Sequence, residues 1–86
     1  MKSKIDPQFR KLLRALPNDV RAQARASYRL FKKDPYHPSL HFKEIAHDVY
    51  SARIGIKYRA LGTRVADDLI LWWWIGSHTD YDKLVK

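Results

Sequence analysis

Basic side chains, a histidine and a tyrosine lie on or beside segments that are predicted to be strands. The basic residues are Lys43, Arg53, Lys57 and Arg59, and His78 and Tyr81 follow the last strand. RNA cleavage needs a base for the ribose 2′-hydroxyl, cations for the charge on the phosphorane and an acid for the leaving oxygen. Neighbouring antiparallel strands lie about 4.8 Å apart, so side chains of three strands can reach one phosphate. The group contains candidates for all three roles, and a solvated basic surface is the alternative interpretation.

Other familiar catalytic signatures are missing from the sequence, which has no GxSxG, GxGxxG or HExxH motif, no P-loop and no cysteine. His37 and His41 have the spacing of a helical metal pair, but Pro38 between them disfavours a helix and no third ligand is near. Asp67 and Asp68 could be paired carboxylates, yet aspartates are also favoured in hairpin turns for backbone reasons. We therefore expect no metal site and no cofactor.

A stripe of arginines marks a second basic region. Arg21, Arg25 and Arg29 follow one another at intervals of four, which places them on one face of a helix, where like charges repel. A solvated face would more often mix charges of both signs. The stripe is therefore either a solvated face or a docking surface for phosphates or for an acidic partner.

Residues 6–33 are predicted to form a helical hairpin that carries this stripe. Asp6 and Pro7 offer an N-cap and a first-turn proline, and apolar residues then recur with helical spacing. Pro17 disfavours helical geometry at the residue before it, which places the break between the two helices there. The two prolines within residues 34–39 end the second helix.

Four strands are predicted to follow, at Leu40–Ile45, Val49–Ile54, Lys57–Val65 and Leu69–Ile75. The last strand, LILWWWI, is apolar throughout and should be a central strand that is covered on both faces. The helices can cover only one of those faces. At least one large aromatic residue is then expected near the surface of the other, as a stacking platform or a partner contact. The candidates for that contact are Trp72, Trp73 and Trp74.

The order of elements predicts one α+β domain over residues 1–86. In it, two N-terminal helices pack on a four-stranded antiparallel sheet. A short C-terminal helix is expected after Gly76, because Thr79 and Asp82 have the spacing of a capping box ahead of Leu84 and Val85.

Composition limits the partners and the compartment. The chain has 86 residues, a net charge of +8 and no cysteine, and a strongly basic balance favours encounter with polyanions such as nucleic acid. Its longest apolar run is too short to span a bilayer, and its N-terminal residues do not form a secretory signal. We expect a cytoplasmic protein with no membrane partner.

The sequence resembles the RelE/ParE superfamily of bacterial toxin–antitoxin toxins over nearly its whole length. The resemblance lies in the element order and in four segments: HPSLHFK at 37–43, YSARIG at 50–55, KYR at 57–59, and IGSH at 75–78 with Asp80 and Tyr81. It implies a small basic toxin that an acidic or amphipathic antitoxin wraps and inhibits. RelE-like members cleave mRNA in the ribosomal A site, whereas ParE-like members inhibit DNA gyrase and lack the nuclease residues.

The resemblance also implies roles for individual residues. Arg59 matches the third-strand arginine that contacts the scissile phosphate, and Arg53 and Lys43 match further basic strand positions. His78 stands where many relatives have arginine, and it becomes the preferred acid–base group because a histidine titrates near pH 6.5. Tyr81 resembles the C-terminal tyrosine, although it lies closer to the fourth strand than usual; it would stack on a base or assist proton transfer.

Three functions follow from these assignments. A ribosome-dependent mRNA endonuclease is preferred, because arginine, histidine and tyrosine are all present. A gyrase inhibitor without nuclease activity is the alternative, and an inactive nucleic-acid-binding relative is the third. In each case the arginine stripe and the tryptophans are assigned to an antitoxin partner.

Overall fold

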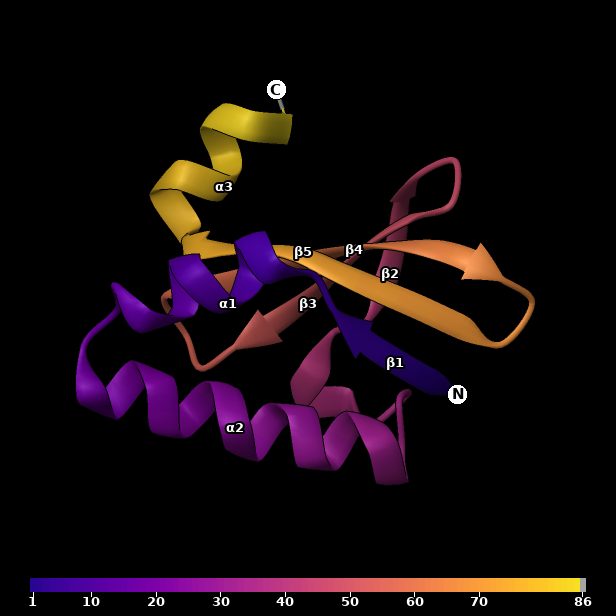
Figure 1. The fold of residues 1–86 in the computed structure, drawn as a ribbon, viewed down its shortest axis with the longest axis horizontal. Coiled ribbons are helices and arrows are strands. Elements are labelled where there is room, and N and C mark those ends of the chain that lie inside the picture. The colour runs from indigo at the N-terminus through magenta and orange to yellow at the C-terminus, as the bar shows by residue number, and fades with distance from the viewer. Residues whose placement is uncertain (86) are drawn as a thin grey trace.

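The computed structural model describes residues 1–85. It contains a five-stranded sheet and three α-helices, in an order that Figure 1 follows from indigo to yellow. In chain order the elements are β1 (Lys2–Ile5), α1 (Pro7–Arg14), α2 (Asn18–Lys33), the short 3₁₀ helix η1 (Pro38–Leu40), β2 (Lys43–Ala46), β3 (Val49–Ile54), β4 (Tyr58–Ala66), β5 (Leu69–Ser77) and α3 (His78–Val85). None of the helices within residues 1–85 has the length and apolar character needed to cross a membrane. The predicted α+β class is confirmed.

The helical hairpin forms where the sequence predicts it. The side chain of Asp6 caps α1 by accepting a hydrogen bond from the backbone N–H of Gln8 at 2.7 Å. Pro17 lies at the N-cap of α2, directly before its first turn, and its carbonyl accepts from the N–H of Arg21 at 3.0 Å. The prolines of the hairpin therefore mark where each helix begins.

The sheet has one more strand than predicted. Its order is β1-β5-β4-β3-β2, and β1 pairs with β5 in parallel, while the other pairs are antiparallel. Alternating apolar residues do not mark β1, which is held by backbone pairing and by Tyr28 of α2. The Ser3 hydroxyl donates to the Tyr28 hydroxyl at 3.0 Å. The expectation of a wholly antiparallel four-stranded sheet is therefore wrong at this edge.

The bounds of β2, β4 and β5 differ from the prediction by one to three residues, and two differences have a local cause. The segment expected to begin the first strand at Leu40 instead forms η1, because Pro38 starts a 3₁₀ turn and His41 then adopts a left-handed conformation with φ 45°. The C-terminal helix is capped by Ser77, whose hydroxyl accepts from the N–H of Asp80 at 3.1 Å, and not by Thr79. The cap moves because β5 continues to Ser77 before the chain turns into α3.

The core lies between α2 and one face of the sheet. Phe31 of α2 meets Trp72 of β5 edge to face, with ring centroids 5.4 Å apart. Ala52, Ile54 and Ala60 supply the same cluster from β3 and β4. Figure 1 shows α2 below the sheet and α3 above it at the end of β5. The residues that alternate with this cluster along β3 and β4 therefore face away from α2.

Candidate nucleic-acid interface

Two arginines lie directly opposite each other on the face of the sheet that α2 leaves uncovered. Arg53 of β3 pairs with Arg59 of β4, and Arg59 pairs in turn with Gly76 of β5. Side chains at directly opposed positions lie about 5 Å apart at Cβ, and like charges there repel. The two guanidinium groups therefore repel each other, and an anion bound between them would reduce this repulsion.

Both arginines are partly buried, and neither is fully paired. Arg59 donates from Nη1 to the carbonyl of Tyr58 at 3.1 Å. The Nε of Arg53 is buried and has no hydrogen-bond partner among residues 1–85. A buried donor without an acceptor is destabilising by about 1–3 kcal/mol. Stems that are packed in this way limit the motion of the guanidinium groups, which suits a site that must hold a phosphate in one position.

A second row of side chains crosses the same face next to the arginine pair. Lys43, Ser51, Leu61 and Trp74 occupy facing positions on β2, β3, β4 and β5 in turn. Lys43 is exposed at the outer strand, whereas Ser51 and Leu61 are buried. The open face thus has cations on the β2 and β3 side and an aromatic ring on the β5 side.

His78 and Tyr81 lie at the end of this face, on the first turn of α3. The backbone N–H of His78 donates to the carbonyl of Lys57 at 2.6 Å, which ties the start of α3 to the β3–β4 turn. Gly76 pairs with Arg59, and His78 follows Gly76 by two residues. The backbone of His78 therefore lies about 7 Å beyond Gly76 along the direction of β5. The imidazole is half exposed, and the Tyr81 ring lies nearly parallel to it with centroids 6.2 Å apart.

Asp82 is a residue of this group that the sequence argument did not assign to the site. Its Oδ2 lies 3.5 Å from Nε2 of His78, one helical turn away. The spacing of four between a histidine and an aspartate on a predicted helix was the available signal. Lys57, which was predicted to lie on the third strand, is instead an exposed residue of the turn before β4.

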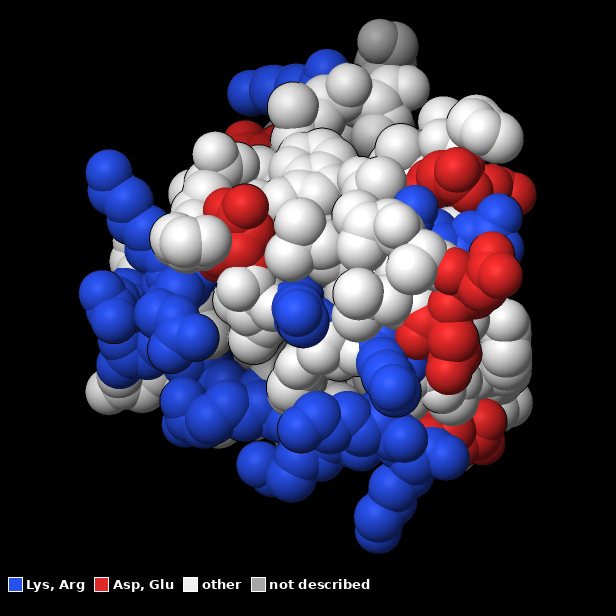
Figure 2. Space-filling model, turned by 45° about the vertical axis from the view of Figure 1, so that its right-hand side comes forward, with Lys and Arg blue, Asp and Glu red and all other residues white. Residues whose placement is uncertain are grey.

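The arginine stripe divides into two parts. Arg21 is partly buried and serves the junction of α1 and α2, because it donates to the carbonyl of Arg14 at 3.2 Å and to the side chain of Asn18. Arg25 and Arg29 are exposed. Figure 2 shows how Lys and Arg collect along the lower part of the molecule, at the height of α2, while Asp and Glu collect on the right-hand edge.

Arg25 and Arg29 border an apolar cavity of about 280 Å³ between the helices and the sheet. Its lining comes from α1, α2, η1 and four strands: Ile5, Phe9, Leu13, Ala24, Arg25, Ser27, Tyr28, Arg29, Phe31, Leu40, Ala52, Ile54, Ala60 and Trp72. An apolar cavity that two exposed guanidinium groups border can take the apolar face of a segment that carries carboxylates beside it. Trp72 is only 4% exposed, so a partner would reach it through this cavity and not at the surface.

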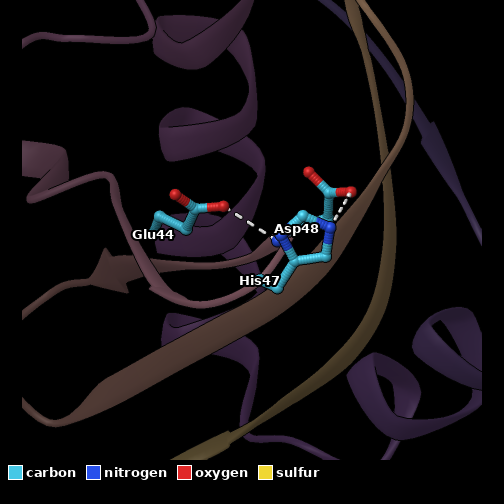
Figure 3. A group of neighbouring side chains, drawn as sticks. All are labelled: Glu44, His47 and Asp48. Carbon is cyan, nitrogen blue, oxygen red and sulfur yellow. Dashed lines mark hydrogen bonds and ion pairs between the residues drawn. The ribbon is translucent and has the colours of Figure 1, made fainter.

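A group of possible metal ligands lies where β2 turns into β3 (Figure 3). Ligand atoms of Glu44, His47 and Asp48 lie within 4.8 Å of one another. Both carboxylates already have partners, since Glu44 accepts from the N–H of Asp48 at 2.8 Å and Asp48 accepts from Arg64 at 3.0 and 3.2 Å. The hydrogen bond and charge of Asp48 raise the pKa of Arg64 above its usual value. The adjacent guanidinium opposes a metal cation, and the group fastens the turn to β4.

The same fold occurs in solved toxin structures. The chain superimposes on the toxin–antitoxin complex RelB–RelE of Methanococcus jannaschii with a TM-score of 0.72 and 19% identity, over 93% of this chain and 95% of that chain. For the RelE–RelB complex of Pyrococcus horikoshii OT3 the TM-score is 0.65 with 24% identity, over 88% and 92%. The isolated E. coli RelE toxin gives 0.64 with 19% identity, over 98% and 94%.

The family is shown by sequence as well. The model of the ParE-like toxin domain matches residues 18–83, from the start of α2 into α3. No curated protein is a significant match to the sequence. The chain belongs to the ParE-like toxin domain family, and it is a toxin of the RelE/ParE superfamily. The resemblance on which the sequence argument rests is therefore confirmed.

Proposed function

We propose that this toxin, acting in the cytoplasm as part of a type II toxin–antitoxin system, cuts mRNA on the ribosome. The observation that supports this proposal best is the pairing of Arg53 with Arg59 on the open face of the sheet, with His78 and Tyr81 at its end. A surface built only to bind protein has no need of two repelling arginines whose stems are packed. The open face needs an enclosure for chemistry, and the ribosome would provide it.

The proposed reaction is transfer of the phosphate to the neighbouring ribose oxygen. The 2′-hydroxyl loses its proton and its oxygen attacks the phosphorus, the bond to the 5′-oxygen breaks, and that oxygen takes up a proton. Arg53 and Arg59 hold the phosphate and stabilise the charge of the phosphorane. Lys43 and Lys57 attract the neighbouring backbone phosphates. His78 is the acid–base group, with Tyr81 assisting the proton transfer and Asp82 orienting the imidazole.

The test is a purified translation system that reads a defined message. When the full-length protein is added, primer extension should reveal new mRNA ends at the ribosomal A site, and the same message without ribosomes should stay intact. Intact message on translating ribosomes would reject the nuclease.

DNA gyrase inhibition is the second candidate, and the match to a ParE-like family model is the observation that favours it. The resemblance implies that ParE-like toxins inhibit gyrase and lack the nuclease residues. The expected result is then inhibition of DNA supercoiling that survives the change His78→Ala. Gyrase that remains fully active in an excess of the toxin removes this candidate.

The proposed partner is a cognate antitoxin, by comparison with the solved RelB–RelE complexes. On this chain, the cavity and the adjoining Arg25 and Arg29 fit an amphipathic segment with apolar residues on one face and carboxylates beside them. Binding there would cover α2 and leave the arginine pair on the opposite face of the sheet uncovered.

A further inference from the structure

Three consecutive tryptophans of β5 have three different environments. Trp72 packs in the core against Phe31. The indole N–H of Trp73 donates to the hydroxyl of Thr63 at 2.9 Å, and its carbonyl accepts from Gln8 at 3.0 Å. Trp73 and Trp74 are both partly exposed, and Trp74 differs from Trp73 in packing its ring over Gly76.

A bulge in β5 explains why the three side chains differ. Gly62 of β4 pairs with Trp72 and Leu61 with Trp74, so Trp73 has no partner across the strand. Trp74 thereby comes into register with Leu61, on the face that also carries Arg59. The bulge therefore directs the Trp74 side chain to the open face.

Gly76 leaves space for the Trp74 ring beside the arginine pair. A Cβ on Gly76 would lie 2.5 Å from Cζ2 and 2.7 Å from Cη2 of Trp74, which no real side chain tolerates. The six-membered ring of the Trp74 indole thus occupies the space that a side chain at position 76 would need. Because Gly76 lies directly opposite Arg59, the ring is the next side chain in the row of Arg53 and Arg59.

Trp74 also lines a shallow depression of about 480 Å³ at the end of β5. Leucines from α1 and α3 form its walls, and Asp80 and Lys83 bring charge to its rim. The full lining is Leu12, Ala15, Leu16, Tyr58, Trp74, Ile75, Gly76, Ser77, Asp80, Lys83 and Leu84. A mostly apolar hollow with an aromatic ring and a few polar groups is typical of sites for small organic ligands.

We propose that Trp74 is the stacking platform for a nucleobase of the bound RNA, in the nucleotide whose phosphate lies between Arg53 and Arg59. This inference rests on the proposed function for the phosphate. The indole lies over Gly76, directly opposite Arg59, so a phosphate held by Arg59 would bring a base of the same strand next to the ring. The carboxylate of Asp80 repels a phosphate from the depression but can accept a hydrogen bond from a base amino group.

The test measures binding of a non-cleavable probe to the full-length toxin. The probe is a fluorescent 2′-O-methyl RNA hexamer, with a set of versions that each lack one base. Trp74→Ala should raise the Kd of the intact hexamer by roughly 5- to 100-fold, the range for one stacked base, and Trp74→Phe should recover most of the affinity. Trp73→Phe is the matched control and should leave the Kd unchanged. Gly76→Ala keeps the indole but displaces the ring, and should weaken binding as Trp74→Ala does.

The base-free probes separate stacking from phosphate binding. For one base-free probe, the Kd with the wild type should equal the Kd of the intact hexamer with Trp74→Ala. The Kd of that same probe should not rise further when Trp74 is changed to Ala. Arg59→Ala should lower the slope of log Kd against log salt by about one, whereas Trp74→Ala should leave the slope unchanged. If Trp74→Phe, Trp74→Ala and Gly76→Ala fold by circular dichroism and all bind RNA like the wild type, the proposal is overturned.

Two further outcomes separate this proposal from the proposed function. The probe cannot be cut, so base stacking is measured independently of cleavage. If the toxin leaves mRNA intact on ribosomes but Trp74 is still coupled to one base, the nuclease proposal is rejected and the stacking proposal stands. Variants that weaken an antitoxin complex while RNA binding stays unchanged would assign Trp74 to the protein partner and reject the base.

Discussion

The two faces of the sheet both carry arginines, but in different surroundings. On the open face, Arg53 and Arg59 extend from paired strands, are partly buried and stand opposite each other. Beside the covered face, Arg25 and Arg29 extend from α2, are exposed and border an apolar cavity. Net charge alone would treat the two regions as one basic surface.

The surroundings of a charge decide what it can recognise. Arginines held close together on a rigid sheet suit one small anion at a fixed place. Exposed arginines beside an apolar cavity suit a longer segment that brings both carboxylates and apolar side chains. The contrast is tested by substituting arginines of one region and measuring both RNA cleavage and antitoxin binding.

The largest effect is expected from Arg59→Ala and from His78→Ala. Each should lower the rate of mRNA cutting on ribosomes by roughly 100-fold or more, because each removes a group that acts on the reacting phosphate or proton. Binding of the antitoxin, measured by calorimetry, should change little. Wild-type cutting rates in both variants would contradict the assigned site.

A complementary loss is expected from the double change Arg25→Glu and Arg29→Glu. Reversing both charges beside the cavity should weaken antitoxin binding by roughly 10-fold or more, since like charges then meet across the interface. In the absence of antitoxin, the rate of mRNA cutting on ribosomes should remain that of the wild type. The double change Arg10→Glu and Lys11→Glu, at exposed positions of α1, is the matched control, because it alters the net charge by the same amount. Equal losses of affinity in the control would show that only overall charge matters.

A smaller effect should follow from filling the cavity with Ala24→Leu. Ala24 is 7% exposed and lines the cavity, so the added carbons should bury apolar area and raise the free energy of unfolding by about 1 kcal/mol. Urea denaturation measures this change, and calorimetry should show weaker antitoxin binding. Ala26→Leu, at an exposed position of the same helix, should alter neither quantity. Unchanged affinity in a stabilised Ala24→Leu variant would mean that the partner does not enter the cavity.

The smallest effect concerns the support of His78. Ser77→Ala removes the cap of α3 and should lower the free energy of unfolding by about 1 kcal/mol, with a modest loss of cutting as the first turn of the helix loosens. Thr79→Ala should be neutral in urea denaturation, because the Thr79 side chain does not cap the helix. A larger loss of unfolding free energy from Thr79→Ala than from Ser77→Ala would support the predicted capping box, with Thr79 as the cap.

Most elements could be predicted because their signals are local. The prolines at 7 and 17 mark the starts of both helices, and the strand at Val49–Ile54 has the predicted bounds. The missed strand Lys2–Ile5 has no such signal, since its pairing with β5 depends on backbone groups and its sequence is mostly polar. The start of β2 was misplaced because one left-handed residue, His41, redirects the chain.

The candidate site was predictable in its residue types and not in its arrangement. The basic and aromatic residues could be named from their places on strands, but the opposition of Arg53 and Arg59 depends on the register of two strands. The contact of His78 with Asp82 depends on where α3 begins. Which tryptophan faces outward depends on a bulge, and a run of identical residues carries no sign of one.

Residue types, short spacings and recognisable segments were enough to predict the fold class, the family and the chemistry available on each element. The pairing of the strands was needed to show which charges lie together and which tryptophan is buried. The reason is physical: strand register and pleat direction are set by pairing between distant segments. In an all-apolar strand such as LILWWWI, either set of alternate side chains could face the core. Pairing with the neighbouring strand and packing against the helix determine which set does.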